Sequence, residues 1–364
     1  MKYVDEFRDP ARARTLVADI QRLVARIPVC RERPLQLMEV CGGHTHAIFR
    51  YALADLLPEV IEFVHGPGCP VCVLPMGVVD DCITIAERPG VIFTTFGDAM
   101  RVPGSGKSLL RAKAEGADVR MVYSPLDALK LARDNPEREV VFFGLGFETT
   151  MPSTALTVQQ ARREAITNFS LFCNHITIIP TLRAILDSPE LRLDGFIGPG
   201  HVSMVIGTAP YEFIAGEYGR PLVISGFEPL DVLQSVWMLL RQLAKGRCEI
   251  ENQYQRIVPR DGNRVALDAV DDVFEPRESF EWRGLGDIDR SGVRMRDTYA
   301  PWDAEKKFTL ARLRISDPES CQCGEVLKGL IKPWQCKVFG KACTPETPLG
   351  ALMVSSEGAC SAYY

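Results

Sequence analysis

Short apolar runs along this chain alternate with stretches in which apolar residues recur every three or four positions. The clearest runs are LQLMEV (35–40), VIEFVHG (60–66), GVIFTTF (90–96) and VVFFGLG (140–146), and several end in glycine or a polar loop. This alternation is typical of β-strands joined by helices in a parallel sheet. The pattern therefore predicts an α/β fold with parallel sheets.

The N-terminal segment has a different pattern, with apolar residues on one helical face over residues 10–27. Asp9 is suited to cap this helix, and Pro10 fits its first turn. We expect an amphipathic helix that packs at the edge of the fold.

Two motifs of the chain have counterparts further on, at a single common offset. The offset that superposes Cys41 on Cys173 also superposes the Gly-Pro-Gly of residues 66–68 on that of residues 198–200. Such an internal echo is typical of duplicated units. It predicts two related Rossmann-like halves.

Three domains are expected. The first α/β half is placed at 1–139 and the second at 140–246. From about residue 247 the sequence becomes charged and irregular before a cysteine-rich end, so 247–364 is placed as a C-terminal domain.

Charge narrows the function classes. The net charge is −5, from 42 basic and 47 acidic residues scattered without long runs, so no basic face is expected for nucleic acid or anionic lipid. The first residues are charged, without the apolar core of a signal peptide, and no segment has the roughly 18 apolar residues of a membrane span. A cytoplasmic protein without nucleic acid or membrane partners is expected.

Twelve cysteines are then hard to explain as disulfides, because the cytosol is reducing; metal ligands, redox thiols or buried side chains are the alternatives. Five of them fall in the last 44 residues, where four thiolates would suffice for an iron-sulfur cluster, with zinc as the alternative. Cys321 is set aside as an alternate, because Cys323 precedes a glycine. The expected ligands are Cys323, Cys336, Cys343 and Cys360.

The segment CGGHTH (41–46) follows the apolar run 35–40. Cys41 should therefore lie at the carboxyl end of a strand, where open α/β sheets bind ligands. Its thiolate suits a metal, and His44 and His46 offer a second contact or a means of lowering the pKa of the thiol.

The segment HGPGCPVC (65–72) holds a Cys-x2-Cys pair, Cys69 and Cys72. This spacing permits a disulfide, a dithiol or two metal bonds, and redox exchange is the first interpretation. Two merely buried thiols, or a zinc site completed by distant residues, are the alternatives.

Two further segments, GFETT (146–150) and GPGHV (198–202), follow predicted strands and are expected to line a cleft facing CGGHTH. Glu148 and His201 are candidates there, although tight turns would need the same glycines. The segment PGSGKS (103–108) matches the end of a phosphate loop, but Arg101 stands where such a loop needs its first glycine. A phosphate-binding ATPase that uses Lys107 is therefore the least favoured alternative.

Taken together, CGGHTH, HGPGCPVC, GFETT, GPGHV and the terminal CGEVLKG…MVSSEGAC resemble the HypD family of hydrogenase maturation factors over nearly the entire chain. The resemblance implies a three-domain α/β protein with a 4Fe-4S cluster. It also implies a scaffold that acts with the small chaperone HypC in assembling the Fe(CN)2(CO) unit of nickel-iron hydrogenases, with cyanide from HypE working with HypF. The hydrogenase large subunit would be an indirect partner.

The resemblance also implies roles for individual residues. Cys41 would bind the transient iron together with a cysteine of HypC, and Cys69 and Cys72 would be the redox pair. Residues implied to support the site are Gly42, Gly43, His44, Thr45, His46, Gly66, Pro67, Gly68, Glu148, Thr149 and His201. The chain would be an assembly factor with redox activity; the alternative is a stand-alone thiol-disulfide oxidoreductase using Cys69 and Cys72.

Overall fold

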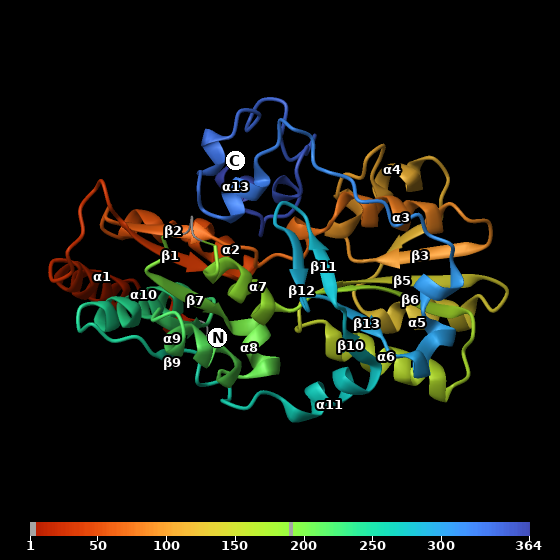
Figure 1. The fold of residues 1–364 in the computed structure, drawn as a ribbon, viewed down its shortest axis with the longest axis horizontal. Helices are drawn as coiled ribbons and strands as arrows, with labels where there is room; N and C mark the ends of the chain where they lie inside the picture. Colours follow the sequence, from red (N-terminus) through yellow and green to blue (C-terminus); the bar gives the residue numbers. More distant parts are fainter. Residues whose placement is uncertain (1–4, 189–191) are drawn as a thin grey trace.

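A computed structural model describes residues 5–188 and 192–364 (Figure 1). One parallel sheet has five strands in the order β2-β1-β7-β8-β9. Its strands are β1 (Leu35–Glu39), β2 (Ile61–His65), β7 (Gly195–Pro199), β8 (Leu222–Ser225) and β9 (Ile250–Asn252).

A second parallel sheet has four strands in the order β4-β3-β5-β6. They are β3 (Val91–Thr95), β4 (Val119–Met121), β5 (Glu139–Gly146) and β6 (Phe169–His175). Nearly every residue of β5 and β6 is buried, as expected of a parallel sheet covered on both faces. The predicted α/β class with parallel sheets is confirmed.

The division of the chain at residue 139 does not match the division of the strands between the sheets. The chain forms β1 and β2 in the first sheet, then all of the second sheet, and then returns for β7, β8 and β9. Each expected half therefore supplies strands to both sheets. The echo does not mark equivalent positions throughout: Cys41 follows β1, whereas Cys173 lies within β6 of the other sheet. The two Gly-Pro-Gly segments lie at the ends of β2 and β7, which belong to the same sheet.

Helices cover both sheets. The helix α1 (Pro10–Val24) forms as predicted, with the Asp9 carboxylate accepting hydrogen bonds from the Ala11 and Arg12 amides. It packs against α10 (Pro229–Leu243) at the outer side of the five-stranded sheet (Figure 1). The other helices are α2 (Gly42–Arg50), α3 (Met76–Ala86), α4 (Leu109–Ala114), α5 (Pro125–Asp134), α6 (Met151–Arg163), α7 (Ile178–Leu186), α8 (Gly200–Ile206), α9 (Glu212–Gly216), α11 (Arg264–Val273) and α12 (Ala304–Lys307).

The region from residue 247 onward is not a single separate body. Its first strand, β9, completes the five-stranded sheet, and two antiparallel pairs follow: β10 (Phe274–Pro276) with β13 (Val293–Met295), and β11 (Ser279–Trp282) with β12 (Gly286–Asp289). β13 contacts β6 of the other sheet.

The cysteine-rich end, residues 309–364, is mostly irregular, with the short helices α13 (Cys323–Leu327) and α14 (Ala359–Tyr363). α14 contacts α2, and α13 contacts β2. The Ser355 hydroxyl donates to the Asp98 carboxylate beyond β3, at 2.8 Å. The C-terminal segment, blue in Figure 1, thus contacts both sheet units.

Within residues 5–188 and 192–364, the helices are all too short or too polar to cross a membrane.

Candidate thiol site between the two sheets

A cavity of about 440 Å³ lies where strands of both sheets end. The CGGHTH, GFETT and GPGHV segments share it, so the predicted cleft is present. Its lining includes Cys41, Gly43, Gly68, Pro70, Phe96, Gly146, Phe147, Thr149, Thr150, His201, Val202 and Glu357. A cavity at the carboxyl ends of parallel strands is the usual place for a ligand in open α/β folds.

Cys41 occupies the N-cap position of α2, and only 8% of its surface is exposed. The loop after β2 presses against its backbone: the Gly42 amide donates to the Gly68 carbonyl at 3.2 Å. A Cβ atom on Gly68 would lie 2.2 Å from the Cys41 nitrogen, and one on Gly42 would lie 2.5 Å from a carboxylate oxygen of Glu357. These glycines are required by the close approach of three segments around Cys41.

The surroundings of Cys41 disfavour its thiolate. Burial raises its pKa well above the ordinary value, and the negative charges of Glu357 and Glu39 raise it further. Of the two roles offered for the histidines, a second contact or a lower pKa of the thiol, the second finds no support, because no histidine side chain is among the groups that shift the pKa of Cys41. His44 is itself kept neutral, because burial lowers its pKa, and His46 is exposed and does not line the cavity.

His44 instead belongs to a stack of rings behind the cavity wall. Its Nε2 donates to the carbonyls of Ser225 and Gly226, at 3.2 and 3.1 Å. Its Nδ1 has no hydrogen-bond partner among the described residues. The His44 ring stacks on Phe227 with centroids 4.6 Å apart, and Phe227 also stacks on His201 at 3.8 Å. Phe227 thus joins the two motif histidines.

Cys69 and Cys72 lie together but behind the cavity. Both are buried, and the Cys72 amide donates to the Cys69 carbonyl at 3.1 Å. Burial raises the pKa of Cys72 well above its ordinary value, and the hydrogen bond with the Cys69 thiol adds to the shift. A Cβ atom on Gly358 would lie 3.0 Å from the Cys72 sulfur. The dithiol therefore faces the C-terminal segment.

Three of the C-terminal cysteines gather. The thiol of Cys321 donates to the sulfur of Cys323 at 3.2 Å, and Cys360 forms a side-chain hydrogen bond with Cys323. Because Gly350 has no side chain, the sulfur atoms of Cys321 and Cys323 fit beside it: a Cβ atom there would lie 2.4 Å from the Cys323 sulfur and 2.5 Å from that of Cys321.

The other two cysteines lie in neighbouring loops. The Cys343 sulfur accepts a hydrogen bond from the Leu349 amide at 3.4 Å, and the Cys336 carbonyl accepts one from the Phe339 amide at 3.2 Å. Within the described parts of the chain, no three His, Cys, Asp or Glu side chains are grouped closely enough to hold a single metal ion.

Glu148 does not line the cavity, unlike its neighbour Thr149. One oxygen of its carboxylate accepts a hydrogen bond from the Ile178 amide at the start of α7, at 3.0 Å, while the other has no partner among the described residues. Burial raises the pKa of Glu148 to about 7. Its visible role is to hold α7 against the end of β5.

Lys107 of the PGSGKS segment forms ion pairs with Glu87 and, at 2.6 Å, with Glu115. Its ammonium group is therefore engaged within the protein.

Four residues of this region were not singled out in the sequence: Glu39, His65, Phe227 and Glu357. The only signal for Glu39 is a carboxylate inside the apolar run 35–40, since a buried charge needs partners. Glu357 lines the cavity and Phe227 stacks on His201 behind it. Both come from distant parts of the chain, and no local pattern reveals them.

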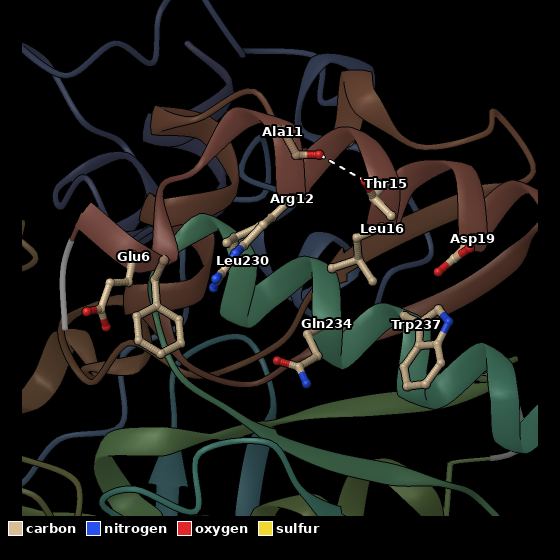
Figure 2. A pocket seen from close by; sticks show the side chains of 10 residues that line it. Glu6, Ala11, Arg12, Thr15, Leu16, Asp19, Leu230, Gln234 and Trp237 are labelled. Carbon is tan, nitrogen blue, oxygen red and sulfur yellow. Dashed lines mark hydrogen bonds between the residues drawn. The ribbon is translucent and has the colours of Figure 1, made fainter.

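A second hollow of about 540 Å³ lies between the N-terminal segment and α10. Figure 2 shows Leu16 and Leu230 facing it, with Trp237 at one end. Its polar lining residues include Glu6, Arg12 and Asp19. Neither cysteine nor histidine lines it.

The fold and the cavity define a class: an α/β protein with two parallel sheets that presents a thiol at the strand ends. A family model named HypD, described as the hydrogenase formation hypA family, matches residues 11–364. The chain belongs to this family.

Full-length relatives agree. The chain is 65% identical to the hydrogenase maturation factor HypD of Rhodobacter capsulatus, over 100% of this chain and 98% of the relative. It is 57% identical to the protein of the same name from Escherichia coli (strain K12), with the same coverage. It is 51% identical to the one from Cupriavidus necator, over 100% of this chain and 97% of the relative. The resemblance noted in the sequence is confirmed, and the chain is a hydrogenase maturation factor.

Proposed function

We propose that this protein is the scaffold on which the Fe(CN)2(CO) unit of a nickel-iron hydrogenase is assembled, with Cys41 as the protein's ligand to the iron. The observation that carries the proposal is the position of Cys41, the cysteine that lines the cavity between the sheets. Thiolate is a soft ligand suited to iron that carries cyanide and carbon monoxide.

The iron is cargo, and the residues around Cys41 suit its capture. Binding as a thiolate releases the thiol proton, which needs an acceptor. Glu357 lines the same cavity, and burial raises the pKa of its carboxyl group, so it is suited to take that proton. The carboxylate of Glu39, which disfavours the free thiolate, favours a cation beside it.

The five C-terminal cysteines fit a 4Fe-4S cluster by their chemistry, since thiolates are its usual ligands. We take Cys323, Cys336, Cys343 and Cys360 as its ligands, with Cys321 as the alternate. A bound cluster supplies single electrons. Cys72 lies close to Gly358 of the C-terminal segment, and Cys69 follows Gly68, which contacts the backbone of Cys41. As a dithiol the pair holds two electrons and two protons that oxidation to a disulfide releases.

Partners complete the assembly. A small chaperone of the HypC type supplies a second cysteine to the iron, and HypE, working with HypF, supplies cyanide. The finished unit passes toward the hydrogenase large subunit, and the work takes place in the cytoplasm. Membership of the maturation family supports a role among other maturation proteins.

Infrared spectroscopy of the protein purified anaerobically with its small chaperone tests the proposal. Cyanide and carbonyl stretches on iron are expected in the wild-type complex and should be absent in Cys41→Ala. The brown colour of the proposed iron-sulfur cluster should persist in this variant, because Cys41 is not among the cluster's expected ligands. Cys30→Ala, which removes an exposed thiol, is the matched control and should keep the bands. A wild-type complex without these bands would overturn the scaffold role.

The alternative, a stand-alone thiol-disulfide oxidoreductase, requires a reactive thiolate at Cys69 or Cys72. Both thiols are buried and the pKa of Cys72 is raised, which favours a dithiol that serves a partner site within the protein. Turnover of small disulfides without any partner chain would support the alternative instead.

A further inference from the structure

Glu39, at the end of β1, is a fully buried carboxylate with three hydrogen-bond donors. One oxygen accepts from the Thr45 hydroxyl and from Nδ1 of His65, the latter at 2.7 Å. The other oxygen accepts from the backbone amide of Cys41 at 3.0 Å. A carboxylate is costly to bury, and this set of donors compensates that cost.

The three donors come from separate pieces of the site. The Cys41 amide lies at the N-cap of α2, Thr45 lies in the first turns of that helix, and His65 ends the neighbouring strand β2. One side chain therefore fixes the end of β1, the start of α2 and the end of β2 relative to one another. These are the elements that determine where the thiol of Cys41 is held.

His65 is in turn held from the other side. Its ring lies 5.4 Å from that of Phe49 and 5.6 Å from that of Tyr363, between centroids. Tyr363 belongs to α14, which also carries Cys360. His65 and Tyr363 line a separate cavity of about 560 Å³ between β2 and the C-terminal segment. Glu39 and its three donors thus extend from the loop that carries Cys41 to the cavity that His65 lines beside β2.

We propose that Glu39 is the positioning residue of the iron-binding thiol: held by His65 and Thr45, it fixes the backbone of Cys41 so that the thiol faces the cavity between the sheets. The inference rests on the proposed role of Cys41 as iron ligand. Partners that orient a metal ligand in this way commonly change metal affinity by about 10- to 100-fold when they are removed.

The test uses Glu39→Gln in the full-length protein with its small chaperone. The glutamine keeps the volume of the side chain but cannot accept from all three donors. Iron retention by the complex should fall by about 10-fold or more, and the cyanide and carbonyl bands that remain should shift or broaden. Glu62→Gln is the matched control: it lies on β2 beside Lys332, only partly buried, and should behave as wild type.

A second readout does not depend on iron. The rate at which iodoacetamide modifies Cys41 in the isolated protein, measured by peptide mass spectrometry, should rise about 10-fold in Glu39→Gln. Modification of Cys69 and Cys72 in the same sample should not change. If Glu39 only stabilised the fold as a whole, its replacement would speed the modification of Cys41, Cys69 and Cys72 alike.

If Glu39→Gln fails to fold, Thr45→Val and Thr45→Ser replace it. The valine variant loses the hydroxyl that contacts Glu39 and should show the faster modification of Cys41, while the serine variant should restore the slow rate. Equal modification rates in wild type, Glu39→Gln and Thr45→Val would overturn the inference. An absence of iron-cyanide bands in the wild-type complex would overturn the proposed function, and the modification rates would still decide the role of Glu39.

Discussion

The sulfur atoms of Cys321 and Cys323 lie 3.2 Å apart, so the spare cysteine of the C-terminal group is in contact with an expected cluster ligand. Proximity alone therefore does not separate the two. Cys360, another expected ligand, forms a side-chain hydrogen bond with Cys323. This contact favours Cys323 as the ligand.

We predict that Cys321→Ser retains the cluster and that Cys323→Ser loses it, because Cys321 contributes only a neighbouring thiol. Iron and acid-labile sulfide per chain, measured after anaerobic purification, check this. A cluster lost from Cys321→Ser but kept in Cys323→Ser would reverse the assignment.

Gly68→Ala should destabilise the protein by about 1–3 kcal/mol or more, because the added Cβ atom would lie 2.2 Å from the Cys41 nitrogen. Gly216→Ala is the matched control. It adds the same methyl group within α9 where no atom lies within 4 Å, and it should be neutral or slightly stabilising. Urea unfolding midpoints measure both. A Gly68→Ala protein as stable as wild type would show that the loop after β2 does not press on Cys41.

The free energy of unfolding should decrease as the pH rises from about 5 to about 8, because Glu148 loses its proton in this range. Burial raises its pKa to about 7 from an ordinary 4.5, so the folded protein holds this proton more tightly than the unfolded chain does. The resulting stabilisation is complete below pH 4.5 and is lost as the pH rises through 7, by up to about 3 kcal/mol.

Glu148→Gln cannot titrate at this position and supplies the comparison. As the pH rises across this range, the wild type should therefore lose unfolding free energy relative to Glu148→Gln. A difference that stays constant would show that Glu148 titrates normally in the folded protein.

Thiol modification of the folded protein should be selective. Cys30 is exposed, whereas Cys69 and Cys72 are buried, so at neutral pH iodoacetamide should modify Cys30 rapidly and the buried pair slowly, until urea unfolds the chain. Mass spectrometry of peptides follows each site. Rapid modification of Cys72 in the folded state would instead favour an independently reactive dithiol.

The sequence allowed the strands, the N-terminal helix and the shared cleft to be predicted, because each depends on local periodicity or on motifs that follow strands. The pairing of β1 with β7 was not predictable in this way, because all four strands of the second sheet lie between them in the sequence. For the same reason, the strands on either side of residue 139 are shared between the two sheets. The stack of His44 on Phe227 and the approach of Glu357 to Gly42 join distant segments. Such contacts arise only once the topology is fixed.

The order of the strands makes the four-stranded unit an insert within the five-stranded one, and after β9 the chain contacts the four-stranded unit again, with α11 against α6 and β13 against β6. The outward crossing, residues 66–75, carries Cys69 and Cys72, and the return passes through α7. Because several separate segments join the two units, each sheet is held against the other at more than one place, and the cavity between their strand ends is bounded by all of these segments. The thiol pair thus lies on a connection between the two sheets, next to Gly68, whose carbonyl accepts the hydrogen bond from the Gly42 amide.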